Sequence, residues 1–288
     1  MLQFTKMHGL GNDYHYIDGV NQDLSGYDLP ELARLMSERH FGVGSDGLIL
    51  ILPSDTADFR MRMFNSDGSE GEMCGNGIRC FAKFVYDHGL TTKTELEVET
   101  GAGIIRPAMT VANGKVNWVR VDMGEPRLTR GLIPMTGDAE APAQNVSLAL
   151  PDKSYTAHCV SMGNPHCVIF VDTITDAQVL NDGPRLEVHE LFPRKTNVEF
   201  VQVLNDHEVN MRVWERGAGE TLACGTGACA TAVAAHLAGH CGREVTVHLR
   251  GGDLKIAWGA DNRITMTGPA VTICTGTMDE DLIAPARR

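Results

Sequence analysis

The sequence predicts an α+β protein built from two pseudo-symmetric domains, and an internal repeat is the main reason. Residues 74–77 read C-G-N-G, and residues 224–227 read C-G-T-G, 150 positions later (224 − 74). The register extends beyond the motif, with eight identities between residues 61–89 and 211–239. This period is too long for a solenoid repeat, which recurs every 20–50 residues, and it indicates a duplicated domain.

Strand patterns dominate both halves of the chain. Apolar and polar residues alternate over 59–64, and the same alternation returns over 209–213. Glycine-rich turns separate several further apolar runs, which predicts hairpins and antiparallel pairing. These further predicted strands cover residues 14–18, 47–52, 95–100, 104–109, 115–122, 166–171, 198–204, 244–249, 253–258 and 263–267.

Helices are fewer and fall at matched positions. Pro30 stands at a first-turn position and predicts one helix. After Cys74, apolar residues recur at i, i+3, i+4 and i+7 up to a stop at Gly89. After Cys224, the run 228–238 is apolar on nearly every side, which is typical of a buried helix. We therefore expect each domain to be a curved, mostly antiparallel sheet wrapped around a central helix that begins at its cysteine.

The repeat also predicts where the domains begin and end. We expect an N-terminal domain on the Cys74 side over residues 1–124 plus 269–288. The C-terminal domain, on the Cys224 side, is expected over residues 125–268, with the active site in the cleft between the two. The stretch 127–150 is expected to be a loose connection.

Composition excludes several classes of function. The formal net charge of −12 disfavours binding to nucleic acid and to anionic membranes. No apolar stretch reaches 18 residues, and the N-terminus lacks the apolar core of a signal peptide, so the expected location is the cytoplasm. The eight cysteines contain no CxxC pair, which argues against a zinc ribbon and a thioredoxin-like site.

A cysteine at the start of a helix is suited to acid/base chemistry. Unsatisfied backbone N–H groups and the helix dipole are expected to lower the pKa of such a thiol. The adjacent glycines allow the backbone to approach an anionic group closely. Two such points could supply acid/base groups to opposite faces of one carbon atom. The alternatives are two buried cysteines at ordinary helix starts, a redox dithiol, and a metal site, which the spacing of the cysteines and histidines disfavours.

Four segments, taken together, resemble the diaminopimelate epimerase family. They are H-G-L-G-N-D at 8–13, the segment 64–80 ending in C-G-N-G-I-R-C, S-M-G-N-P-H-C at 161–167, and the segment 214–228 ending in C-G-T-G-A. The motifs occur in order and the resemblance covers essentially the whole chain. It implies a cofactor-independent isomerase that interconverts LL- and meso-2,6-diaminopimelate, on the route to lysine and peptidoglycan, without pyridoxal phosphate or metal.

The resemblance also implies a role for each matching residue. Cys74 and Cys224 would be the catalytic pair, with Cys74 donating and Cys224 accepting a proton in the LL-to-meso direction. His166 and Glu215 would be accessory catalytic residues. The implied substrate-binding residues are Asn12, Gly47, Asn65, Gly75, Asn76, Asn164, Asn197, Glu215, Arg216, Gly225 and Thr226. The partner would be the small-molecule substrate, and the protein would be a homodimer that binds neither nucleic acid nor membrane.

One position departs from the family pattern. Some members carry Gln where this chain has Gly47, so one side-chain contact to the substrate is missing. Two other readings stay open: a two-cysteine racemase of the proline or hydroxyproline type, and a non-catalytic amino acid binding protein of the same fold. The first usually has His at the position of Asn76, and the second could lose a thiol.

Overall fold

The computed structural model describes residues 1–288, which form two compact units. Unit 1 comprises Met1–Val121 and Gly268–Arg288, and unit 2 comprises Asp122–Thr267. Each unit combines a mixed sheet with a small number of helices, which confirms the predicted α+β class. None of the helices combines the length and the apolar character needed to cross a membrane.

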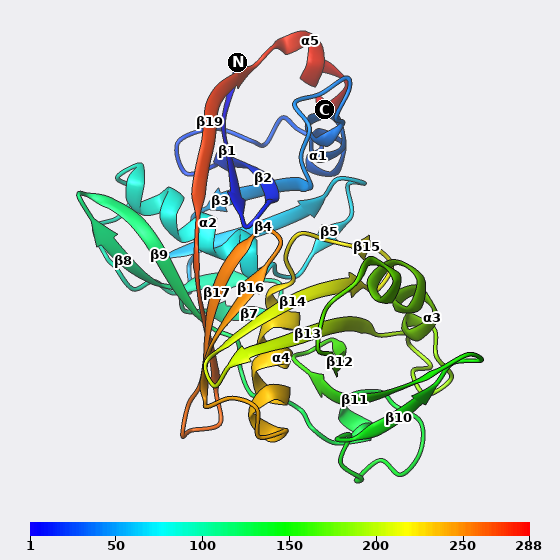
Figure 1. Ribbon diagram of the computed structural model, residues 1–288. Helices are drawn as coiled ribbons and strands as arrows, with labels where there is room; N and C mark the ends of the chain where they lie inside the picture. The colour runs from blue at the N-terminus through cyan, green and yellow to red at the C-terminus, as the bar shows by residue number, and fades with distance from the viewer. The chain divides into compact units, whose positions relative to one another are not determined.

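Unit 1 is built on a sheet with the strand order β19-β1-β2-β3-β4-β6-β7, and β5 pairs with β4. The first and last strands of the chain, blue and red in Figure 1, therefore lie side by side. The elements are β1 (Leu2–Gly9), β2 (Asn12–Asp18), α1 (Leu29–Ser37), β3 (Gly47–Leu52), β4 (Phe59–Asn65), β5 (Glu70–Gly71), α2 (Gly75–Asp87), β6 (Val98–Thr100), β7 (Gly103–Ile105), β8 (Ala108–Ala112), β9 (Lys115–Asp122), β19 (Val271–Met278), α5 (Glu280–Ile283) and η3 (Ala284–Ala286).

Unit 2 repeats this plan with the order β10-β11-β12-β13-β14-β16-β17-β18, and β15 pairs with β14. Its central helix α4 packs across the sheet and contacts the strands from β11 to β17 (Figure 1). The elements are η1 (Arg130–Leu132), β10 (Val146–Ala149), β11 (Ser154–Ser161), β12 (Pro165–Phe170), η2 (Ala177–Asp182), α3 (Gly183–Glu187), β13 (Asn197–Asn205), β14 (Glu208–Glu215), β15 (Gly219–Glu220), α4 (Gly225–Leu237), β16 (Glu244–Leu249), β17 (Gly252–Trp258) and β18 (Ile264–Pro269).

The two units share one topology. In unit 1, β2 pairs with β3 and β4 with β6 in parallel, because a helical connection separates the members of each pair. In unit 2, β12 pairs with β13 and β14 with β16 in the same parallel way. The central helices α2 and α4 each have 13 residues and begin 150 positions apart. This correspondence confirms the duplication.

The middle strands are covered on both faces. Leu48 and Leu50 of β3 join the core cluster beneath α1, whereas Ile49 points to α2, where it lies under Gly77. Alternating side chains of a strand point to opposite faces, so α1 and α2 cover opposite sides of β3. In β13, Val198 and Phe200 join the core cluster of unit 2 in the same way. Residue 199, between them, therefore faces α4.

Some elements were not predicted from the sequence. These are the strands β1, β5, β10, β11, β15 and β19, the turn η1, the helical turns over 177–187, and the short C-terminal helices α5 and η3. The prediction that residues 127–150 form a loose connection was wrong in part. This segment contains β10, and it contributes Ile133, Ala143 and Leu148 to the core. Its apolar residues are spaced without a clear period, so only their burial against β11 and β12 reveals their role.

Candidate active site

Cys74 is the N-cap of α2 in unit 1. Its backbone is extended, and its Sγ accepts a hydrogen bond from the Gly77 N–H at 3.4 Å. The half-buried thiol donates in turn to Oδ1 of Asn12, also at 3.4 Å. The same Asn12 oxygen accepts from the side-chain amide of Asn76. Three of the predicted site residues, Asn12, Cys74 and Asn76, are thus brought together at the start of one helix.

A buried arginine is hydrogen-bonded to the first turn of α2. Arg79 is fully buried, and its guanidinium donates to Asn76 Oδ1 at 2.8 Å and to the Gly75 carbonyl at 3.0 Å. A further bond reaches the Pro269 carbonyl at 3.3 Å. Because Arg79 is always charged, it places a positive charge beneath Cys74. This residue was not predicted from the sequence.

Gly47 and Asn65 lie opposite each other where β3 and β4 pair. Asn65 is partly exposed and donates to Ser69 Oγ at 3.0 Å. A Cβ atom at Gly47 would lie 2.1 Å from the Phe64 carbonyl oxygen and 2.8 Å from the Tyr14 ring. The local backbone therefore leaves no room for a side chain at position 47.

Cys224 is the N-cap of α4 in unit 2, in the same geometry as Cys74. Its Sγ accepts from the Gly227 N–H at 3.4 Å and contacts Thr226 Oγ1 at 3.5 Å. Gly225 and Thr226 form the first turn of α4, so their N–H groups are among those that have no partner within the helix. Each unit thus presents a thiol beside a short run of backbone donors, a place suited to a carboxylate.

A chain of polar groups extends from Thr226 into the core of unit 2. The Asn164 side-chain amide donates to Thr226 Oγ1 at 3.2 Å, and Asn164 Oδ1 lies 3.0 Å from His166 Nε2. The other ring nitrogen of His166 lies 2.6 Å from Glu199 Oε1. His166 and Glu199 are both fully buried. The structure therefore connects two predicted residues, Asn164 and His166, with a carboxylate that was not predicted from the sequence.

The remaining predicted residues of unit 2 lie where β13 and β14 meet. Asn197 Oδ1 accepts from the backbone N–H of Arg216 at 2.9 Å. The exposed Arg216 guanidinium donates to the Arg194 carbonyl at 3.1 Å and keeps other N–H groups available. Glu215 accepts from the Thr221 hydroxyl. Burial raises the pKa of Glu215, while hydrogen bonds from Thr221 and Cys224 oppose this shift.

The prediction of low thiol pKa values was wrong. Burial raises the pKa of Cys74, and the Gly77 and Asn76 N–H groups and the Arg79 charge offset this only in part. Burial raises the pKa of Cys224 well above its usual range, and the negative charges of Glu215 and Glu199 add to the effect. The helix N-terminus acts in the expected direction at both thiols, but desolvation of the thiolate outweighs it.

Three buried groups could be considered as metal ligands. One ligand atom each from His166, Glu199 and Cys224 lies within 4.8 Å of the others. However, His166 Nδ1 and Glu199 Oε1 are only 2.6 Å apart, whereas two ligands of a tetrahedral zinc ion are separated by roughly 3.3 Å. In this arrangement the two groups share a hydrogen bond with each other, so the donor set does not fit a common ion.

Comparisons with known proteins identify the family. The family model described as diaminopimelate epimerase matches residues 4–129 and 158–273. A diaminopimelate epimerase of Moorella thermoacetica is 56% identical over 281 residues, covering 97% of this chain and 100% of that protein. One from Methanococcus maripaludis is 55% identical over 279 residues, covering 96% of this chain and 100% of that protein.

Solved structures agree on the fold. A phenazine biosynthesis protein of Bacillus anthracis superposes with a TM-score of 0.69 at 16% identity, covering 96% of this chain and 99% of that one. At that identity the likeness shows the fold alone, whereas the match to the family model and the relatives at more than half identity extends over both thiol sites. The chain belongs to the diaminopimelate epimerase family.

Proposed function

We propose that this protein is a diaminopimelate epimerase that interconverts the LL and meso forms of 2,6-diaminopimelate. The observation that carries this proposal is the pair of N-cap thiols, Cys74 and Cys224, in a duplicated frame within a chain of this family. Inverting one carbon requires a group that removes a proton and another that delivers one. Each unit supplies one such group.

In the proposed reaction, Cys224 as thiolate takes the α-proton of the LL substrate and Cys74 as thiol delivers its own proton to the opposite face. One C–H bond breaks and one forms, so the substrate gains no charge, while the thiol and thiolate forms are exchanged between the two cysteines. The N–H groups of Gly75, Asn76, Gly225 and Thr226 hold the adjacent carboxylate and stabilise the charge that moves onto it.

The raised thiol pKa values fit this role. A thiolate with a high pKa is a stronger base toward a weakly acidic C–H group than a thiolate with a low one. Near Cys224, burial and then the carboxylate of Glu215 disfavour the thiolate in the free protein. The α-ammonium group of the substrate would compensate this negative charge, so we propose that substrate binding itself promotes ionisation of Cys224.

The distant amino acid centre of the substrate would be held by Arg216 and by the amides of Asn65, Asn164 and Asn197, with Asn12 nearby. The free guanidinium N–H groups of Arg216 suit a carboxylate. Remote binding energy of this kind helps position the reacting carbon, so truncated substrates should lose turnover as well as affinity. Alanine and lysine should therefore be poor substrates; activity on alanine equal to that on diaminopimelate would instead favour a broad racemase.

The decisive assay is incubation with meso-diaminopimelate in D₂O, followed by mass spectrometry and separation of the stereoisomers. Deuterium incorporation together with formation of the LL form supports the proposal. L-proline and trans-4-hydroxyproline are included as substrates, because turnover of these alone would support the proline-type racemase. Binding of diaminopimelate without exchange would support a non-catalytic binding protein.

Single replacements of the thiols test the two-base assignment. Cys74→Ala and Cys224→Ala should each lower epimerisation by at least about 1000-fold, because each face of the carbon needs its own group. Cys241→Ala, a cysteine outside both motifs, is the control and should retain activity. Near wild-type epimerisation by Cys74→Ala would refute the two-base mechanism.

We also propose that the protein is a cytoplasmic homodimer. Two catalytic thiols stay reduced most readily in a reducing compartment. Strand β19 ends the sheet of unit 1, and residues 271–275 are exposed and uncharged. Such an unprotected edge readily pairs with another strand, and a second copy of β19 can pair with it antiparallel about a two-fold axis.

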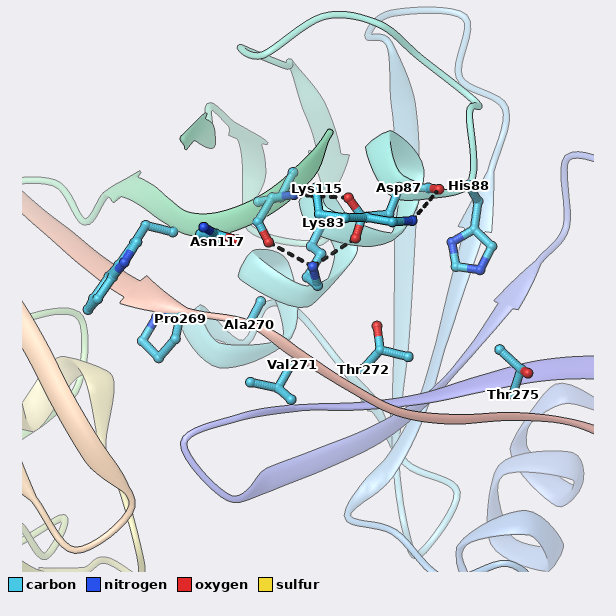
Figure 2. A pocket seen from close by; sticks show the side chains of 12 residues that line it. Lys83, Asp87, His88, Lys115, Asn117, Pro269, Ala270, Val271, Thr272 and Thr275 are labelled. Carbon is cyan, nitrogen blue, oxygen red and sulfur yellow. Dashed lines mark hydrogen bonds and ion pairs between the residues drawn. The ribbon is translucent and has the colours of Figure 1, made fainter. Parts of the chain in front are cut away.

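Figure 2 shows the surroundings of this edge. Val271, Thr272 and Thr275 line a hollow of about 800 Å³ in unit 1, whose far side carries Lys83 fixed to Asp87. An Ile273→Lys variant should convert a dimer to a monomer in light scattering coupled to size-exclusion chromatography, since the side chain is half exposed on β19. A monomeric wild-type protein would refute the dimer.

A further inference from the structure

Glu199 is a charged residue within an otherwise apolar strand. It is fully buried in β13, where it faces α4. One carboxylate oxygen, Oε1, contacts His166 Nδ1 at 2.6 Å, and the other, Oε2, has no hydrogen-bond partner. A buried carboxylate with an unsatisfied oxygen costs stability, so its presence points to a functional rather than a structural advantage.

The contacts of His166 indicate one protonation state. The side-chain amide of Asn164 donates to Thr226, so Asn164 Oδ1 is the atom that faces His166 Nε2. Nδ1 faces Glu199 Oε1. Both ring nitrogens therefore face oxygen atoms, and when Glu199 is ionised only the doubly protonated imidazolium can donate to both. A carboxylate–imidazolium pair also compensates the charge of buried Glu199.

The packing around Glu199 distinguishes the two halves of the duplication. A Cβ atom at Gly227 would lie 2.8 Å from Glu199 Oε1, so the carboxylate packs directly against the first turn of α4. The counterpart of Glu199 in unit 1 is Ile49 (199 − 150), which packs against Gly77 of α2 in the same way, since a Cβ atom at Gly77 would lie 2.7 Å from Ile49 Cδ1. An apolar residue thus fills this position in one unit, and the fold does not require a carboxylate there.

We infer that Glu199 is a positioning residue of the proposed epimerase, which holds His166 as an imidazolium and thereby orients Asn164 and Thr226 beside Cys224. The inference rests on the proposed function. The chain from Glu199 to Thr226 consists of three successive hydrogen-bonded contacts, of 2.6, 3.0 and 3.2 Å. This chain of contacts determines that the Asn164 amide presents its nitrogen to the substrate, because its oxygen is hydrogen-bonded to His166.

Two variants separate this role from a merely structural one. Glu199→Gln keeps the shape of the side chain and removes its charge. Glu199→Ile copies the residue that unit 1 carries at the same strand position. Asp182→Asn is the matched control, because Asp182 is another buried carboxylate of unit 2, bonded to Tyr155 and Lys153, that belongs to none of the predicted site residues.

The first readout is the protonation of His166, measured by ¹⁵N NMR of histidine-labelled protein at neutral pH and assigned with His166→Asn. We expect both ring nitrogens to be protonated in the wild type and only one in Glu199→Gln. The second readout is steady-state kinetics. Both Glu199 variants should lower kcat by about 10- to 100-fold, the usual cost of losing a partner that orients a functional histidine, with KM changed less than kcat. Asp182→Asn should keep the wild-type kcat.

Thermal unfolding is the third readout. Both Glu199 variants should unfold within a few degrees of the wild type, because His166 can lose its extra proton once the carboxylate is gone, so that no uncompensated charge stays buried. A neutral His166 in the wild type, a wild-type kcat in Glu199→Gln, or a kcat loss that follows a large loss of stability would each overturn the inference. If the wild type does not epimerise diaminopimelate at all, the proposed function fails, while the NMR result still tests the Glu199–His166 pair.

Discussion

Replacing Arg79 with Met tests the electrostatic support of the Cys74 helix start. The change keeps an unbranched side chain in a fully buried position but removes the charge and the hydrogen bonds to the Asn76 side chain and to the carbonyls of Gly75 and Pro269. Each of these three hydrogen bonds contributes about 1 kcal/mol. The expected loss is therefore about 3 kcal/mol of unfolding free energy.

The stability loss can be read as a change in the melting temperature of unit 1. For a domain of this size, 1 kcal/mol corresponds to roughly 3 °C, so Tm should fall by roughly 10 °C in differential scanning calorimetry. Arg34→Met is the control, because Arg34 is mostly exposed and its ion pair with Glu31 lies on the surface. Such surface pairs contribute about 0–1 kcal/mol, so its Tm should barely change.

The same variant should change the pH dependence of activity. The Arg79 charge lowers the pKa of Cys74 against the raising effect of burial, so its removal raises this pKa further. In the meso-to-LL direction the proposed base is the Cys74 thiolate. The rising limb of the rate profile should therefore move to higher pH in Arg79→Met. An unchanged limb together with an unchanged Tm would refute the role assigned to Arg79.

Three further predictions concern single positions. Gly47→Ala should destabilise the protein by roughly 2–4 kcal/mol in urea unfolding, because its Cβ would lie 2.1 Å from a carbonyl oxygen of the neighbouring strand. A loss of unfolding free energy below about 0.5 kcal/mol would contradict this steric clash. Burial, assisted by the charge of Lys6, lowers the pKa of His15 to about 4 in the folded protein. The unfolded chain therefore binds this proton more tightly than the folded one. The unfolding free energy of the wild type should fall by about 3 kcal/mol as the pH drops from about 6.5 to 4. A His15→Leu variant should lose that dependence, and an equal dependence in both proteins would show that other groups cause it. Gly227→Ala should slow turnover, because its Cβ would lie 2.8 Å from Glu199 Oε1 and 3.2 Å from Cys224 Sγ, whereas Gly242→Ala, with no atom nearer than 3.9 Å, should not. Equal rates in the two variants would count against tight packing around this turn of α4.

The sequence alone was sufficient for the repeat, and local signals in it were sufficient for the two central helices. The apolar stripe after Cys74 and the stop at Gly89, which has a φ of 74°, involve residues close along the chain. The N-cap positions of Cys74 and Cys224 follow from the same short-range signals. Capping, helix period and termination depend on contacts within a few residues, so they can be read without knowledge of the tertiary fold.

The electrostatics of the site depended on the tertiary structure. Whether a helix-start thiol has a low or a high pKa depends on how deeply the fold buries it and which charges lie around it, and here burial outweighed the helix N-terminus. Glu199 meets His166 from 33 residues away, and β19 pairs with β1 from the opposite end of the chain. A charged residue inside an apolar strand is visible in the sequence, but its partner is not. Desolvation and the pairing of distant groups arise from packing between elements, and only the folded chain decides them.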